Sequence, residues 1–126
     1  MKIAYVDTSC LVAIAFAESG GTAMERRLQK LDEIVSANLL EAELRASFAR
    51  EGADMDAGFL TRVSWVLPNR PLGPEIIRVL AVGHLRGANL WHVACAVYLA
   101  GDPSRISFLT LDRRQRDVAK TLGFVV

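Results

Sequence analysis

The sequence has few of the residues that build disulfide frameworks or zinc sites. It contains two cysteines, Cys10 and Cys95, and two histidines in 126 residues. Both cysteines lie in apolar runs, so we expect buried free thiols rather than a disulfide or a metal site. Because no Cys/His cluster is present, a zinc site is not expected.

Long apolar runs and a signal-peptide layout are also missing. No stretch approaches the roughly 20 apolar residues that span a bilayer, and the N-terminal residues enter a strand pattern directly. We therefore expect a soluble, cytoplasmic protein with no membrane association. No linker, repeat or low-complexity tract divides the chain, so residues 1–126 are expected to form one domain.

The chain lacks a strong net charge as well. Its formal charge is +1, so no overall basic field points to nucleic acid. Of the 15 cationic residues, 12 are arginine and three are lysine. Arginine suits bidentate phosphate contacts, but it also forms surface ion pairs, so the composition supports nucleic-acid binding only weakly.

The sequence does contain short apolar runs that alternate with helical patterns. Strands are expected at 3–6, 34–36, 65–67, 106–109 and 124–126. Helices are expected at 10–16, 22–31, 38–50, 54–63, 74–87, 90–100 and 112–122. This alternation predicts an α/β protein, a three-layer α/β/α sandwich around a central parallel sheet of about five strands.

The first strand ends abruptly in Asp7, Thr8 and Ser9. Its residues 3–6 are consecutively apolar, which is typical of a strand covered on both faces. Parallel sheets bind ligands at the carboxyl ends of their strands, where Asp7 is expected. The alternative is that Asp7 or Thr8 only caps the helix that follows.

Two glutamates of the helix at 38–50 differ in their surroundings. Glu41 has capping-box spacing to Asn38 and an i+4 partner in Arg45, so a structural role in the helix accounts for this glutamate. Glu43 has no cation three or four positions away, and two leucines flank it on the helix. A carboxylate in such a place costs free energy unless a metal or another partner stabilises it. We therefore interpret Glu43 as a functional residue.

The second half of the chain offers four further polar candidates. Asp112 follows the strand at 106–109 closely and also has capping-box spacing to Gln115. Asn89 is expected to be the N-cap of the apolar helix. His92, one turn further, is more typical of a hydrogen-bonded core residue than of a ligand or a general base. Asp117 is a minor candidate that can pair with a neighbouring arginine.

Together these side chains can converge at one edge of a parallel sheet. Asp7 and Asp112 follow strands, whereas Glu43 and Asn89 lie near helix starts. Oxygen ligands without thiolate or imidazole are the set that Mg²⁺ or Mn²⁺ prefers. Three unneutralised carboxylates would repel one another. The chemistry indicated is metal-assisted hydrolysis of a phosphodiester bond.

The same motifs resemble a known family in their order and spacing. They are Tyr5-Val6-Asp7-Thr8-Ser9, Ala42-Glu43-Leu44, the segment from Leu85 to Ala94, and Phe108-Leu109-Thr110-Leu111-Asp112. Each motif alone is weak, but all four in sequence are specific. They resemble the PIN domain and, more narrowly, the VapC ribonuclease toxins of bacterial toxin–antitoxin pairs.

This resemblance implies a fold, an activity and partners. It implies a parallel sheet between helices, an acidic pocket that binds Mg²⁺ or Mn²⁺, and cleavage of RNA, such as tRNA or rRNA, at exposed single-stranded positions. It also implies a homodimer and a VapB-type antitoxin that blocks the pocket. The metal-binding acids would be Asp7, Glu43 and Asp112, with Ser9 and Thr110 as supporting hydroxyls.

Asn89 departs from the family pattern, because PIN domains that resemble this chain normally carry aspartate there. An Asn carbonyl can still coordinate a cation, but the pocket loses one negative charge, and with it metal affinity and water activation. Two explanations remain. The chain is a natural member with weakened catalysis, or an Asp-to-Asn substitution was introduced so that a toxic nuclease could be produced; the intact pattern around position 89 favours the second.

Two other classes of function compete with the nuclease. A receiver-like or phosphatase-like domain also has an aspartate after its first strand, but the phosphatases need a second carboxylate where Ser9 stands, and neither Lys30 nor Lys120 is placed as a receiver requires. The non-catalytic alternative is an inactive PIN-like module that binds RNA or protein.

Overall fold

All strands of the protein belong to one parallel sheet. The computed structural model describes residues 1–126. The strands are β1 (Ile3–Val6), β2 (Glu33–Ala37), β3 (Val63–Val66) and β4 (Ile106–Leu109), in the spatial order β3-β2-β1-β4. Every neighbouring pair is parallel. β1 and β4 are direct neighbours in this order, so their carboxyl ends meet at the same edge of the sheet.

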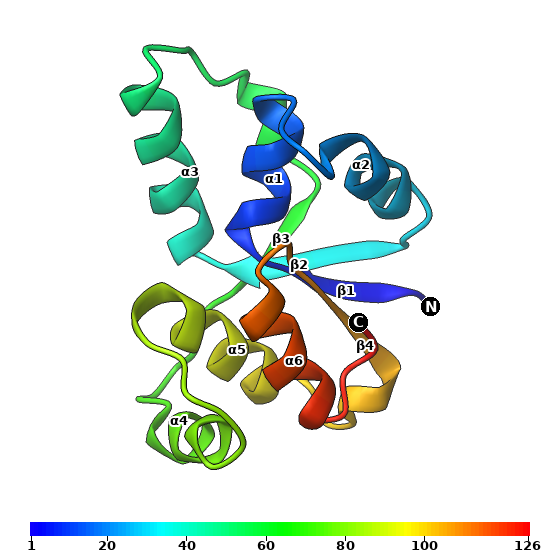
Figure 1. The fold of residues 1–126 in the computed structure, drawn as a ribbon, viewed down its shortest axis with the longest axis vertical. Coiled ribbons are helices and arrows are strands. Elements are labelled where there is room, and N and C mark those ends of the chain that lie inside the picture. The colour runs from blue at the N-terminus through cyan, green and yellow to red at the C-terminus, as the bar shows by residue number, and fades with distance from the viewer.

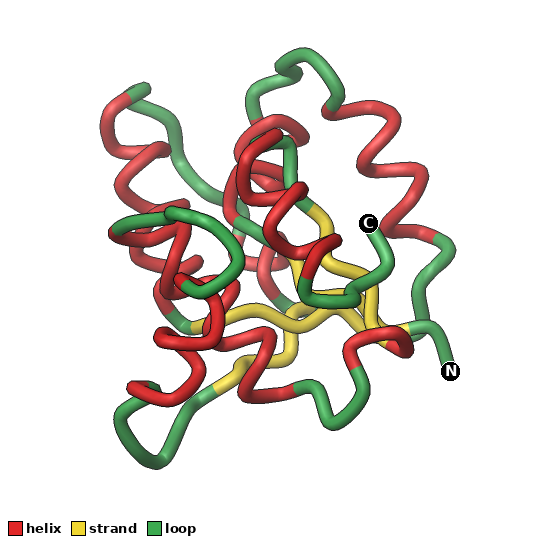
Figure 2. Tube along the Cα trace, turned by 60° about the horizontal axis from the view of Figure 1, so that its bottom comes forward, coloured by secondary structure: helices red, strands yellow, loops and turns green.

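Helices cover both faces of this sheet. α1 (Thr8–Ala15), α2 (Gly21–Gln29) and α3 (Leu39–Arg50) lie on one face, and α4 (Gly73–Leu80), α5 (Gly87–Leu99) and α6 (Arg113–Thr121) lie on the other (Figure 1). Figure 2 shows the strands passing through the middle of the molecule with helices around them. None of the helices is both long and apolar enough to cross a membrane. The predicted three-layer α/β/α class is confirmed.

Two hydrophobic cores form because successive strand residues point to opposite faces. Ala4 and Val6 of β1 join the core under α1, α2 and α3, whereas Tyr5 joins the core under α5 and α6. Both faces of β1 are thus buried. This explains why its residues are consecutively apolar rather than alternating.

The segment predicted as a fifth strand, residues 124–126, forms only an isolated β-bridge and not a strand. Val125 forms an isolated parallel bridge to Ser107 of β4. Two hydrogen bonds hold it, from Phe108 N to Val125 O at 2.7 Å and from Val125 N to Ile106 O at 3.1 Å. The sheet therefore has four strands, and the bridge adds one residue pair beside β4.

Several predicted boundaries are shifted. The strand expected at 65–67 is β3 at Val63–Val66, because Leu67 is 65 % exposed and the following Pro68 has no N–H to pair. The helix expected at 54–63 is only a short 3-10 helix, Ala57–Leu60. The helix expected to reach Gly87 ends at Leu80.

Segment 81–86 is where the chain crosses from α4 to α5. It passes so close to α6 that a Cβ on Gly83 would lie 2.7 Å from a methyl carbon of Val118. Arg86 is extended, with φ −143° and ψ 164°, and α5 begins at the next residue. Close packing against α6 therefore ends α4 at Leu80, although the apolar pattern of the sequence continues beyond it.

The starts of α2 and α3 have no side-chain cap, so the capping box predicted for α3 does not form. α2 begins at Gly21, where an added Cβ would lie 2.4 Å from the Ala13 carbonyl oxygen, so close contact with α1 fixes its start. Asn38 has helical φ and ψ angles and makes no side-chain cap bond. The predicted pair of Glu41 with Arg45 is confirmed, with Arg45 Nε 2.8 Å from Oε2 of the glutamate.

The two cysteines are free and buried, as predicted. Cys10 lies on α1 and Cys95 on α5, on opposite sides of the sheet. Burial raises the pKa of each thiol to about 12. Neither forms a nucleophilic or metal-binding site.

Candidate functional site

The central feature of the site is the buried carboxylate of Asp7, only 4 % exposed, at the carboxyl end of β1. Its Oδ2 accepts the Ser9 amide at 3.1 Å, which makes it the N-cap of α1. No lysine or arginine lies within 4 Å of it; besides the Ser9 amide, Gln115 Nε2 donates to Oδ1 at 3.3 Å, and Thr110 Oγ1 lies 3.3 Å from Oδ2. Asp7 therefore caps the helix and still keeps a buried negative charge without a cationic partner.

The end of β4 is joined to Asp7 by a set of hydroxyl and amide groups. Thr110 Oγ1 donates to Gln115 Oε1 at 2.6 Å and accepts the Asp112 amide at 3.0 Å. Ser9 Oγ accepts the Leu111 amide at 3.0 Å and lies 3.4 Å from Thr110 Oγ1. The two hydroxyls expected to support the site therefore connect the start of α1 to the β4–α6 turn.

Asp112 combines a structural contact with a place in the site. Its Oδ1 accepts the Gln115 amide at 2.8 Å, so it caps α6 as the spacing predicted. Its Oδ2 faces Asn89 Nδ2 at 3.5 Å. The prediction that Asn89 is an N-cap is wrong, because α5 begins at Gly87 and Asn89 is its third residue.

Glu43 has a partner that local sequence could not reveal. Its Oε1 accepts hydrogen bonds from Thr8 Oγ1 and His92 Nε2, both at 2.7 Å. Burial alone would raise the pKa of Glu43, but the hydrogen bonds from His92 and Thr8 outweigh it and hold the pKa below its ordinary value. Glu43 has no local cation, as predicted, and the partners that stabilise its charge come from α1 and α5.

His92 is fully buried and connects three parts of the protein. Tyr5 Oη accepts the Ala37 amide at 3.1 Å and lies 2.7 Å from His92 Nδ1. Burial raises the pKa of Tyr5, so the phenol keeps its proton and donates it to Nδ1. In neutral His92 the ring proton is then on Nε2, which donates to Glu43 and lies 3.8 Å from Asp7 Oδ1. The imidazole is the hydrogen-bonded core residue that was predicted, and it also separates two of the carboxylates.

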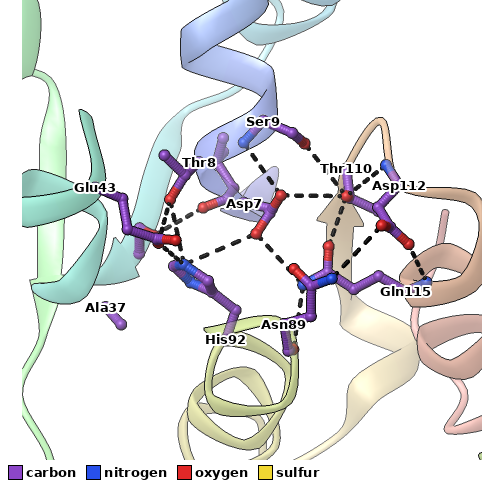
Figure 3. A network of polar contacts seen from close by, with 12 residues as sticks. Asp7, Thr8, Ser9, Ala37, Glu43, Asn89, His92, Thr110, Asp112 and Gln115 are labelled. Carbon is purple, nitrogen blue, oxygen red and sulfur yellow. Dashed lines mark hydrogen bonds and ion pairs between the residues drawn. The ribbon is translucent and has the colours of Figure 1, made fainter. Parts of the chain in front are cut away.

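Figure 3 shows how the predicted site residues lie relative to one another. Asp7 is in the middle, Glu43 and His92 are on one side, and Thr110 and Asp112 are on the other. Asn89 points up from α5 toward the Asp7–Asp112 side. All of them line the same sheet edge, but Glu43 is bound to His92 rather than turned toward the other two acids.

The donor set fits a Mg²⁺ or Mn²⁺ ion only in part. No group of three or more His, Cys, Asp or Glu side chains is arranged to hold a metal. Asp7 and Asp112, with the Asn89 amide between α5 and α6, supply the oxygen donors that Mg²⁺ prefers, and Mg²⁺ commonly uses one or two carboxylates and keeps several waters. The chemistry of the Asp7–Asp112 side therefore fits a divalent ion, with Glu43 outside it.

Sequence reasoning missed three side chains of this network. Gln115 was interpreted only as a capping residue, but it is fully buried and its Nε2 also donates to the Asn89 carbonyl at 3.2 Å. A signal for it exists, because Gln115 shares a helix face with the apolar residues three, four and seven positions later. Tyr5 and Thr8 have no comparable signal. Asp117, the minor candidate, is exposed and makes no ion pair.

Replacing His92 with alanine is expected to destabilise the protein by about 2–5 kcal/mol. The change opens a cavity, leaves the Tyr5 hydroxyl proton without an acceptor and removes one of the two hydrogen bonds that Glu43 Oε1 accepts. The free energy of unfolding, measured with urea, reports the effect. His84, the other histidine, is exposed, and its alanine variant is the control, expected within about 0.5 kcal/mol of the parent. Equal stability of the two variants would disprove the connecting role of His92.

Nearly the whole chain matches one protein-family model, that of the PIN domain, over residues 4–121. The match runs from β1 to the end of α6 and so includes every residue of the site described above. No curated protein and no solved structure matches the chain.

Proposed function

The chain belongs to the PIN domain family, and from this we propose that it is a divalent-metal-dependent endoribonuclease. Proteins of this family are generally metal-dependent nucleases. The observation that carries the proposal is the buried Asp7 carboxylate, which has no lysine or arginine partner and faces the Asp112 side of the sheet edge. A buried carboxylate in this state is a candidate for binding a cation.

Asp7 and Asp112 are the residues that would hold Mg²⁺ or Mn²⁺, with the side-chain oxygen of Asn89 as a neutral donor. A bound ion of this kind activates water and offsets charge on the phosphate. Gln115 fixes the orientation of the Asp7 carboxylate by donating from Nε2 to Oδ1, and Thr110 positions Gln115 by donating to its Oε1. Ser9 Oγ accepts the Leu111 amide and so connects the start of α1 to the turn that follows β4.

Glu43 is the third acid of the proposed site, and its role depends on where its two carboxylate oxygens lie. Thr8 and His92 both donate to its Oε1, which leaves Oε2 without a protein partner. The side chain is 31 % exposed, so this oxygen is accessible to water. Glu43 would orient a water or join the ion after a change of rotamer.

The biological role in this proposal is that of a VapC-type toxin. It comprises cleavage of single-stranded or loop positions in RNA, inhibition by a VapB-type antitoxin and a homodimeric state. The motif resemblance supports these parts. They can be tested separately from catalysis, by co-purification with the antitoxin and by measuring the mass of the protein in solution.

Cleavage of a defined single-stranded RNA tests the nuclease function directly. We expect the purified protein to cut internal bonds in the presence of Mn²⁺, and chelation with EDTA to stop the reaction. A DNA oligonucleotide of the same sequence is the matched control and should be cut much more slowly. Mapping the new 5′ ends identifies the cleaved position. Cleavage that persists in EDTA would contradict the metal-dependent mechanism.

A second function, an inactive PIN-like module that binds RNA or protein, is favoured by one observation. The Asn89 amide donates to Asp112 at 3.5 Å where a carboxylate would complete the acidic set, and no three acids converge. This alternative predicts RNA binding without any Mn²⁺-dependent product. The cleavage assay therefore separates the two functions.

A further inference from the structure

A basic surface cavity lies directly beside the acidic site. Its volume is about 160 Å³, and its walls include Asn89 and Asp112, which the proposed site already uses. The remaining walls come from the segment before α5 and from the first turn of α6, namely His84, Leu85, Arg86 and Arg114. Leu85 is the only apolar residue among the six.

The cationic groups of this cavity are not engaged by the protein. Neither Arg86 nor Arg114 has a side-chain hydrogen bond, and neither lies within 4 Å of a carboxylate, Asp112 included. Of the other ten arginines, five form a side-chain hydrogen bond or ion pair, as Arg70 does with Glu75 and Arg62 with two backbone carbonyls. Two unpaired guanidinium groups and an imidazole in one hollow provide donors suited to an anion.

The chemistry of these donors indicates a phosphate group. Arginine presents a planar fork of N–H donors that matches phosphate oxygens, and two arginines line this cavity. α5 begins at this cavity with Arg86 at its N-cap position, without a capping side chain and without an acidic residue in its first turn. Its free N–H groups add to the positive potential but are secondary to the arginines.

We propose that this cavity, which we call the basic cradle (His84, Arg86 and Arg114), binds a backbone phosphate of single-stranded RNA next to the bond to be cleaved. The inference rests on the proposed nuclease function for its placement, because Asn89 and Asp112 are shared between the two sites. The cradle holds a flanking phosphate while the cleaved bond lies over Asp7 and Asp112. It therefore contributes to RNA affinity and not to bond cleavage.

Binding of a short RNA without metal tests the cradle separately from catalysis. In EDTA, we expect the double variant Arg86→Gln/Arg114→Gln to bind a fluorescent single-stranded RNA at least tenfold more weakly than the parent. The slope of log Kd against log salt should fall by about 0.7 for each lost phosphate contact. Both arginines are exposed, so the thermal midpoint should not change.

Arg78→Gln is the matched control. Arg78 is exposed on α4 and lines a different cavity with Val97. Val97 is eight residues beyond Asn89 on α5, about 12 Å along the helix axis. This variant removes one positive charge, so it is compared with the single variants Arg86→Gln and Arg114→Gln, and it should leave both Kd and the salt slope unchanged. An equal loss in Arg78→Gln and in these single variants would overturn the cradle in favour of diffuse charge attraction.

Steady-state cleavage provides the second readout. Because the cradle would bind substrate and transition state alike, the double variant should raise KM about tenfold while kcat stays within about threefold. Parent-like RNA affinity in the double variant, or absence of RNA binding by the parent, overturns the inference. If arginine-dependent binding is found without Mn²⁺-dependent cleavage, the cradle is supported and the nuclease proposal fails.

Inorganic phosphate distinguishes RNA from the free anion as the ligand of the cradle. Added at constant ionic strength, it should compete only weakly with RNA, since the oligonucleotide makes further contacts at the neighbouring site. Displacement of RNA by phosphate at concentrations near that of the RNA would overturn the assignment to an RNA backbone.

Discussion

The Asn89→Asp variant is expected to cleave RNA about 10–100-fold faster than the parent in Mn²⁺. The added carboxylate would lie beside Asp112, where Asn89 Nδ2 now lies 3.5 Å from Oδ2. A carboxylate binds a divalent ion more strongly than a neutral amide oxygen does, so the gain appears in both metal affinity and rate. Initial rates at several Mn²⁺ concentrations measure both.

The same variant should be less stable when metal is absent. Two carboxylates at this separation repel one another by between about 1 and 4 kcal/mol, depending on how well water screens them. We therefore expect a lower melting temperature in EDTA and recovery when Mn²⁺ is added. Thermal unfolding with and without the ion tests this reversal.

Asn69→Asp is the matched control for the added charge. Asn69 is exposed, and its side chain accepts from Tyr98 Oη, nine residues along α5 from Asn89. This variant should show neither faster cleavage nor Mn²⁺-dependent stabilisation. Equal activity of Asn89→Asp and the parent would exclude position 89 as a metal ligand.

Asp7→Asn is expected to lower Mn²⁺-dependent cleavage by at least about 100-fold. Asparagine caps helices as well as aspartate does, so α1 keeps its start while the site loses its buried charge. Because no lysine or arginine pairs with Asp7, removing the charge should leave the melting temperature in EDTA unchanged or raise it. Loss of activity without loss of stability is the signature of a functional carboxylate.

Asp102→Asn is the corresponding control. Asp102 also caps a short helix, accepting the Ser104 amide at 3.0 Å, but it is exposed and far along the chain from the strand ends of the site. Its variant should cleave RNA at the parental rate. If Asp7→Asn also keeps the parental rate, Asp7 has only its capping role and the proposed catalytic site is wrong.

The fold class was predictable because its signals are local. The consecutive apolar residues 3–6 indicate a strand buried on both faces, and the structure places β1 between β2 and β4. The end of α4 was not predictable, because it depends on the contact between Gly83 and Val118, which lie 35 positions apart. Periodicity along the chain carries no information about such a contact.

The site was predictable to a similar extent. The positions of Asp7 and Asp112 follow from the rule that the carboxyl ends of parallel strands share an edge. The partner of Glu43 did not follow, because His92 reaches it from another helix, 49 positions later. Helical spacing can show that a carboxylate lacks a local cation, but it cannot show which distant donor replaces that cation.

The strand order has a consequence for when activity can appear during synthesis. β4 completes the sheet beside β1, and Asp112 follows Asp7 by 105 positions. A ribosome that has not yet released β4 and the start of α6 carries a polypeptide with one of the two carboxylates missing and an open edge on β1. Under the proposed function, cleavage of RNA therefore cannot begin until Asp112 and the start of α6 have emerged from the ribosome, without any additional inhibitor.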